Sequence, residues 1–220
     1  GITPETVDTG AVIITGETSR KENAATVLHA LSNYAGKFVV ATAGPELESV
    51  LAARGAGAVE ESWNKTVLHM DIGGGTSNLA LCREGEIVAT GCLNVGGRLL
   101  KLKESGEITY ISPVLQGIIP EKRGDILTES RGMEIAGLLA SVLEMAAGCR
   151  EKTDLFTHFT TAGTVAVPVT TGVTVSFSGG VADCVQREAH WLAYGDLGPL
   201  LGKAIRESAL CRGPYRLGSQ

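Results

Sequence analysis

Short apolar runs separated by polar turns mark the first strands of the chain. Residues 11–15 and 38–41 are two such runs, and each predicts a buried strand. Between them, residues 19–36 open with a Ser-x-x-Glu capping pattern and then repeat apolar positions at helical spacing. Residues 45–53 begin with Pro and predict a second helix. This strand–helix–strand–helix order predicts two neighbouring parallel strands joined by a right-handed crossover.

The middle of the chain shows three closely spaced apolar runs, at residues 67–70, 79–82 and 87–90. Short turns rich in Gly or charge separate them, so they predict a hairpin or meander. The longest helical pattern covers residues 128–147 and carries apolar side chains on one face. Residues 150–171 are rich in Thr and are expected to be irregular.

The last third of the chain predicts one more strand and two helices. Residues 173–177 form an apolar strand pattern, a Ser-Gly-Gly turn follows, and a helix is expected from residue 181. Residues 196–208 predict the final helix. With strands and helices interspersed along the chain, the fold class is α/β.

The turn between the first two runs of the meander contains three consecutive glycines. Glycine weakens strands, so three in a row are justified where the backbone must approach a ligand closely. Their N–H groups can converge on phosphate oxygens. Asp71 precedes the turn and is the expected catalytic residue, holding Mg²⁺ through water, since Mg²⁺ prefers carboxylate and phosphate oxygens. The candidate phosphate-binding residues are Gly73, Gly74, Gly75, Thr76 and Ser77.

A second glycine site lies about a hundred residues further on, at Ser178, Gly179 and Gly180. Glycine between a strand and a helix allows a flat group to rest on the backbone. An ordinary strand-to-helix turn often carries glycine too, so the signal is weak alone. The two sites together fit one nucleotide bound at its phosphates and at its adenosine.

The amino-acid composition and net charge of the chain argue against several classes of function. The 220 residues are 44% hydrophobic, enough for a substantial core, and only 5% aromatic. The net charge of −5 argues against a nucleic-acid partner or an acidic membrane surface. No apolar run approaches the length that spans a bilayer.

The order of these motifs resembles the actin, DnaK-type chaperone and sugar-kinase superfamily, in which residues 71–81 match the second phosphate motif and residues 178–183 the adenosine motif. The chain is more closely similar to the EutA family of ethanolamine utilisation, the reactivating factors of ethanolamine ammonia-lyase. The segments that carry this similarity are residues 7–18, 38–45, 71–80, 92–100 and 196–201.

The resemblance implies an actin-like ATPase (ribonuclease H-like) fold that binds ATP and Mg²⁺. It also implies an ethanolamine ammonia-lyase partner, from which such factors release inactivated cobalamin. The five cysteines are an odd count with no C-x-x-C pair, which favours reduced thiols and a cytoplasmic location. Association with a bacterial microcompartment is implied by the resemblance.

The resemblance further implies two lobes with a boundary near residue 65. Residues 1–65 match a remnant of the first lobe, and residues 66–220 match most of the second. The first phosphate motif and the terminal element of the second lobe do not occur in the chain, which is therefore expected to be a fragment. Such a fragment is expected to fold, to bind Mg-ATP weakly and to self-associate through exposed strand edges.

Three other functions remain open: an actin-like small-molecule kinase, a polyphosphatase-type phosphohydrolase, and a non-catalytic assembly module supported by nucleotide. Asn78 stands where many chaperone relatives carry Asp. An amide cannot act as a general base, so rapid ATP hydrolysis is not expected even in the intact protein.

Overall fold

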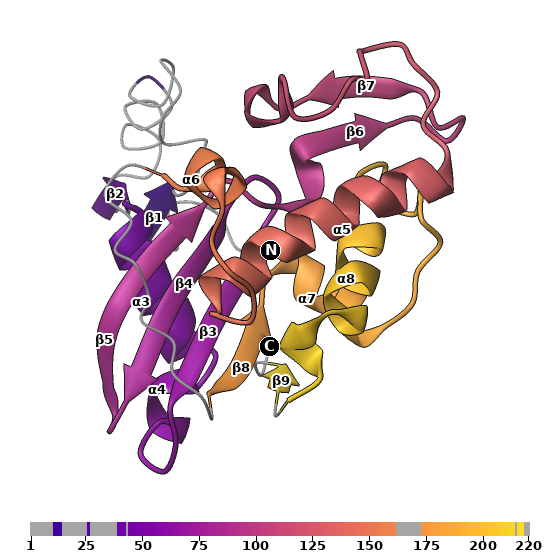
Figure 1. The fold of residues 1–220 in the computed structure, drawn as a ribbon. Coiled ribbons are helices and arrows are strands. Elements are labelled where there is room, and N and C mark those ends of the chain that lie inside the picture. The colour runs from indigo at the N-terminus through magenta and orange to yellow at the C-terminus, as the bar shows by residue number, and fades with distance from the viewer. Residues whose placement is uncertain are drawn as a thin grey trace.

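The computed structural model describes residues 11–14, 26, 39–42, 44–161, 173–213 and 215–217. A five-stranded mixed sheet forms its centre (Figure 1). The strand order is β5 (Glu86–Leu93), β4 (Ser77–Arg83), β3 (Val67–Ile72), β8 (Thr174–Ser178) and β9 (Tyr215–Leu217). The first three strands form the antiparallel meander that the sequence predicts, and β8 and β9 run parallel to β3. This topology is that of a ribonuclease H-like lobe, which confirms the expected α/β fold class.

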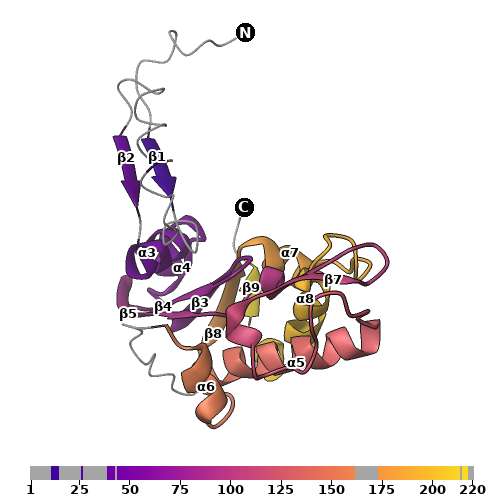
Figure 2. The same ribbon diagram turned by 90° about the horizontal axis from the view of Figure 1, so that it is seen from above.

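Helices cover both faces of this sheet. Figure 2 shows α3 (Pro45–Gly55) and α4 (Ala58–Glu61) on one face, with α5 (Glu129–Ala146) and α6 (Asp154–Phe159) on the other. α7 (Gly180–Gln186) contacts β3 and β8 and packs against α8 (Gly198–Glu207), which also contacts α5. In the part of the chain that the structure describes, no helix combines the length and apolar character needed to cross a membrane.

The alternation of side chains along β3 gives its two faces different environments. Leu68 and Ile72 are fully buried in the main core, between the sheet and the α5 and α8 side of the protein. Val67 points to the opposite face, where it joins a small apolar cluster with residues of α3 and α4. Because successive strand residues alternate, His69 and Asp71 share this second face. The polar end of β3 therefore lies outside the main core.

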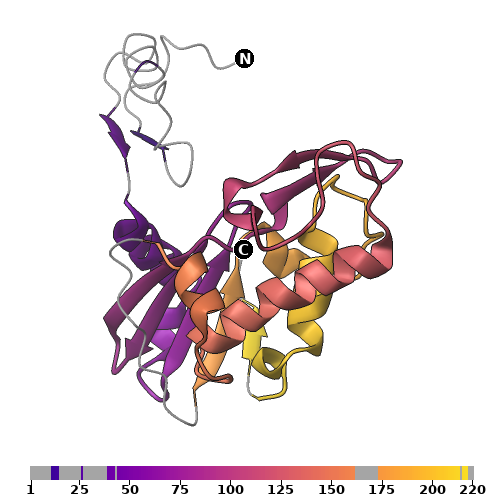
Figure 3. The same ribbon diagram turned by 45° about the horizontal axis from the view of Figure 1, so that its top comes forward.

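The N-terminal strands form a separate pair. β1 (Ala11–Ile14) and β2 (Val39–Thr42) are parallel, as expected, and Figure 3 shows them extending away from the five-stranded sheet. The helix expected over residues 19–36 lies outside the described residues. The lobe boundary near residue 65 stays a prediction. α3 and α4, which precede it, pack against β3 and β4.

A small hairpin of β6 (Leu100–Leu102) and β7 (Ile108–Ile111) follows β5. Three 3₁₀ turns occur at Gly97–Leu99, Pro113–Leu115 and Ala209–Cys211. The expectation of an irregular segment over residues 150–171 is wrong for α6. Phe159 at the end of α6 is fully buried in the main core, and this tertiary anchor outweighs the weak local pattern. Residues 162–171 lie outside the described part of the chain.

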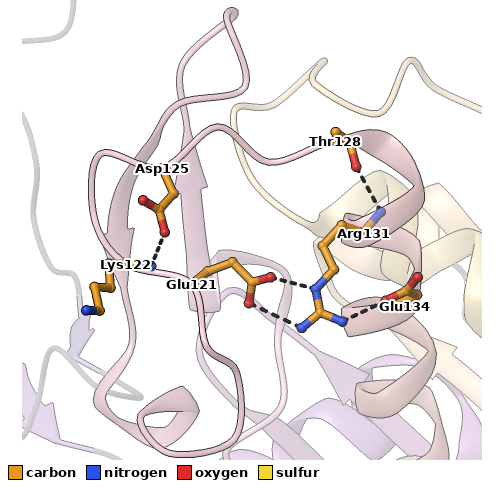
Figure 4. Close-up of polar contacts among 6 residues, drawn as sticks. All are labelled: Glu121, Lys122, Asp125, Thr128, Arg131 and Glu134. Atoms are coloured by element: carbon orange, nitrogen blue, oxygen red, sulfur yellow. Dashed lines mark hydrogen bonds and ion pairs between the residues drawn. The ribbon is translucent and has the colours of Figure 1, made fainter.

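Hydrogen bonds and ion pairs around Arg131 connect the segment after β7 to the start of α5 (Figure 4). The guanidinium of Arg131 donates from Nε and Nη2 to the two carboxylate oxygens of Glu121, at 2.6 and 3.3 Å. Its Nη1 donates to Glu134 at 2.6 Å, and its backbone N–H donates to the helix-capping hydroxyl of Thr128 at 3.3 Å. The hydrogen bond from Arg131 lowers the pKa of Glu121 below its ordinary value.

We expect Glu121→Gln to reduce stability by about 1 kcal/mol or less at pH 7, the range of partly exposed ion pairs. Because the folded-state pKa of Glu121 is lowered, its contribution is present above the ordinary Glu pKa. It is then lost as the pH falls through the lowered value. Urea unfolding of both proteins from pH 7 to pH 3 should show the difference shrinking below about pH 4.5. The exposed Glu104→Gln is the control, and an equal pH dependence for both variants would contradict the prediction.

Candidate functional site

The turn between β3 and β4 is held by its own carbonyl groups. Gly73 donates its N–H to the carbonyl of Thr76 at 3.0 Å, which closes the turn. The carbonyls of Gly73 and Gly74 accept the N–H groups of Gly97 and Arg98 at 3.0 and 2.6 Å. The N–H groups of Gly74 and Gly75 have no backbone partner among the described residues. The turn therefore has two N–H donors without a backbone partner, while three of its carbonyl groups accept hydrogen bonds within the protein.

A chain of hydrogen bonds joins Asp71 to the second glycine site. The Ser178 hydroxyl donates to Oδ1 of Asp71 at 2.6 Å. Because that proton goes to the carboxylate, Ser178 Oγ accepts from Nε2 of the fully buried His69 at 3.0 Å. Nδ1 of His69 then accepts from the Ser176 hydroxyl at 3.1 Å. This chain fixes the tautomer of His69 and orients the Asp71 carboxylate.

The hydrogen bond to Asp71 connects Ser178, a residue of the second glycine site, with the end of β3. Its hydroxyl belongs to the Asp71 side of the site, where it positions a carboxylate. The parallel pairing of β8 with β3 places Ser178 directly beside Asp71. The two glycine motifs are therefore connected through these two side chains.

Asn78 lies opposite Asp71 in the β3–β4 register, so both side chains lie on the same face of the sheet. Asn78 is 2% exposed, and its Oδ1 has no hydrogen-bond partner among the described residues. Buried acceptors are normally satisfied, often by an ordered water. An acceptor next to a carboxylate fits the water shell of a Mg²⁺ ion, which keeps several of its waters. Among the residues that the structure describes, no group of three His, Cys, Asp or Glu side chains could hold a metal ion.

Gly179 lets the second turn approach β3. Its φ of +85° lies in the region that L residues rarely adopt. A Cβ there would come within 2.5 Å of the Ile72 carbonyl oxygen and 2.9 Å of Asp71 Oδ1. Only glycine therefore allows this turn to lie against the end of β3.

A cavity of about 440 Å³ opens between the two glycine turns and α8, within the range of small-molecule sites. Of the predicted residues, Gly73, Gly74 and Gly180 line it. A Cβ on Gly180 would meet no atom within 4 Å, so this glycine leaves open space. The other lining residues are Gly97, Arg98, Val181, Asp183, Cys184, Tyr194, Asp196 and Gly198.

Several predicted residues lie outside this cavity. Ser77 is fully buried, and its hydroxyl donates to the Val95 carbonyl at 2.7 Å. The hairpin itself therefore uses the hydroxyl proton of Ser77, and phosphate binding at this residue stays a prediction. Gly75 and Thr76 form the tip of the turn beside the cavity. Gly179 acts through the backbone geometry of the second turn.

Arg98 and Asp196 are cavity residues to which sequence reasoning gave no role. Arg98 Nε donates to Asp196 Oδ2 at 3.4 Å, across 98 positions of sequence. Burial raises the pKa of Asp196, while the hydrogen bonds from the Gly198 N–H and from Arg98 act against that rise. The available signal was the pair of glycines before Arg98, which marks a second close approach of backbone. A Cβ on Gly96 would come within 2.4 Å of the Gly74 carbonyl oxygen.

The mixed sheet, the glycine turn after an Asp, and the adjoining cavity define an actin-like ATPase lobe. The sequence profile of the family "Ethanolamine utilisation protein EutA" matches residues 1–216, and the chain belongs to this family. The ethanolamine ammonia-lyase reactivase EutA of Salmonella typhimurium is 41% identical over 222 residues. Its counterpart in Escherichia coli is 41% identical over 215 residues. Each match covers 94% of this chain and 46% of the relative, so the chain spans about half the length of these curated proteins.

Solved structures with related architecture are more distant in sequence. An exopolyphosphatase from Cytophaga hutchinsonii is 14% identical, with a TM-score of 0.47, and the match covers 90% of this chain and 64% of that protein. The ethanolamine utilization protein EutJ from Carboxydothermus hydrogenoformans is 18% identical, with a TM-score of 0.43. That match covers 94% of this chain and 60% of EutJ.

Proposed function

We propose that the complete protein is an ATP-dependent reactivating chaperone for ethanolamine ammonia-lyase, releasing inactivated cobalamin from that adenosylcobalamin-dependent enzyme. The observation that carries this proposal is the 41% identity to two reactivases over 94% of the chain. The lyase is the proposed protein partner. The proposed location is the cytoplasm, in association with a bacterial microcompartment that houses ethanolamine utilisation.

The proposed nucleotide site is the cavity between the two glycine turns. The free N–H groups of the first turn would donate to phosphate oxygens. Asp71 would hold Mg²⁺ through water, with the unsatisfied Oδ1 of Asn78 accepting from that water shell. Gly180 leaves room for a flat group, and the exposed ring of Tyr194 at the cavity edge offers an aromatic face to it.

Bound ATP would supply free energy through cleavage of its terminal phosphate. The chain itself supplies orientation and charge at this site, and it offers an amide, Asn78, beside Asp71. An amide does not remove a proton from an attacking water. We therefore expect slow ATP turnover.

The test is reactivation of cobalamin-inactivated ethanolamine ammonia-lyase by the complete protein, with Mg²⁺ and fresh adenosylcobalamin. We expect lyase activity to recover at least tenfold more with ATP than without it. Equal recovery without ATP would contradict the proposal. Conversion of ATP to ADP with the phosphoryl group transferred to a small molecule, and no free phosphate released, would instead support a kinase.

Two glycine variants link this assay to the cavity. Gly180→Leu places a side chain into open cavity space, so ATP-dependent recovery should be lost while the protein stays folded. Gly137→Leu is the matched control, because Gly137 is an exposed position of α5 whose Cβ would also meet no atom within 4 Å. Recovery by Gly180→Leu at the level of the control would place the nucleotide elsewhere.

A further inference from the structure

Arg98 carries the positive charge of the proposed nucleotide cavity. Among the described residues that line the cavity, it is the one cationic side chain, and Asp183 and Asp196 add two carboxylates. A polyphosphate entering this space meets both carboxylates, so its binding requires compensating positive charge near the phosphates. The hydrated Mg²⁺ proposed at Asp71 supplies part of this charge. Arg98 is the protein group placed to supply more.

The backbone and the side-chain stem of Arg98 pack against the turn between β3 and β4. Its N–H donates to the Gly74 carbonyl at 2.6 Å. A Cβ built on Gly74 would lie 3.2 to 3.5 Å from Cδ, Cγ and Cβ of Arg98, so the stem rests on the turn. The side chain is nevertheless 69% exposed, and Arg98 is one of the residues that line the cavity. Arg98 is thus adjacent to the donors that are available for phosphate.

Asp196 orients the guanidinium group through a single nitrogen. Oδ1 of Asp196 accepts the Gly198 N–H at 2.8 Å, which fixes the carboxylate at the start of α8. Its Oδ2 accepts from Nε of Arg98 at 3.4 Å. Neither Nη1 nor Nη2 of Arg98 has a hydrogen-bond partner within the described ranges. The planar group is therefore held on one edge, and the other edge is left with unused donors.

We propose that Arg98 binds the phosphate that lies on the Gly73–Thr76 turn, donating from Nη1 and Nη2 while Asp196 holds Nε. A guanidinium fork matches two phosphate oxygens at once, which makes such contacts stronger and more directional than those of an ammonium group. Asp196 is then a positioning residue that acts through Arg98. This inference rests on the proposed function, because it assigns one contact within the same nucleotide site.

The test is equilibrium binding of Mg-ATP and of adenosine to the complete protein by calorimetry. We expect Arg98→Gln to weaken ATP binding at least tenfold and to change adenosine binding less than twofold. Arg98→Lys keeps the charge without the fork, so it should recover only part of the ATP affinity. The exposure of Arg98 makes a folding defect unexpected, and thermal unfolding of each variant checks this.

Arg150→Gln is the matched control. Nε of Arg150 also pairs with one carboxylate, Glu144 at 3.2 Å, and its side chain is 55% exposed, but it does not line the cavity. This variant should bind ATP as the parent protein does. It removes the same charge, so it separates a local contact from a change in net charge.

The outcomes distinguish this inference from the proposed function. If the parent protein binds ATP and Arg98→Gln binds it equally well, the contact is wrong and the proposed function stands. Equal losses of ATP and adenosine would place Arg98 at the base, and full ATP affinity in Arg98→Lys would remove the two-oxygen contact. If the parent protein binds no ATP, the proposed ATP dependence is wrong and the Arg98 contact is wrong with it.

Discussion

Replacing Asp71 by Asn in the complete protein is expected to lower Mg²⁺-dependent ATP turnover at least tenfold, about 1.4 kcal/mol in barrier height. The amide keeps the shape of the carboxylate and can still accept the Ser178 proton. The Asn variant loses the negative charge that would hold a hydrated Mg²⁺ beside the turn between β3 and β4. Phosphate release under saturating Mg-ATP measures the effect, and urea unfolding should show little change in stability.

Asp125→Asn is the control for this variant. Asp125 also accepts one strong hydrogen bond through its carboxylate, from the N–H of Lys122 at 2.7 Å (Figure 4). It is exposed in the segment before α5 and belongs to neither glycine turn. Its turnover should equal that of the parent protein. A turnover number for Asp71→Asn within twofold of this control would remove Asp71 from the metal site.

The local patterns of the chain predicted most of the secondary structure around this site. Alternating and continuous apolar runs located β3, β4, β5 and β8, and the helical spacing over residues 128–147 located α5. These elements are long or strongly apolar, so the local pattern and the tertiary structure agree. The glycine turns could also be found, because three adjacent glycines have few structural uses.

The contacts between distant segments could not be predicted in the same way. Ser178 and Asp71 are 107 positions apart, and their hydrogen bond depends on β8 pairing in parallel with β3 at one register. The same pairing brings His69 into contact with Ser176 and Ser178. The hydrophobic period within one segment does not determine at which register it pairs with a distant strand.

Competition for hydrogen bonds within the fold explains the position of the Ser77 hydroxyl. Ser77 has the residue type and position of a phosphate donor, yet the carbonyl of Val95 takes its proton within the folded hairpin. Arg98 shows the opposite case, because its local sequence suggests an ordinary surface cation. Its proposed role depends on Gly74 and Asp196, which are brought to it only by the packing of the 96–98 segment and of α8.

A substitution in the second glycine turn is expected to have a large effect on stability. Gly179→Ala requires a φ near +85° from a residue with a Cβ, which costs about 1–3 kcal/mol. The added methyl also meets the Ile72 carbonyl oxygen at 2.5 Å, and backbone cannot move aside as a flexible side chain does. We expect the free energy of unfolding to fall by about 3 kcal/mol in urea titrations.

The next residue provides a control within the same turn. Gly180 is the first residue of α7, its φ is not in the left-handed region, and a Cβ there would meet no atom within 4 Å. Gly180→Ala should therefore leave stability unchanged or raise it by up to about 1 kcal/mol, because it restricts the unfolded chain. Equal losses for the two variants would mean that the turn tolerates no side chain at all. Equal stability for both would mean that the close approach of Gly179 to β3 is not required for the fold.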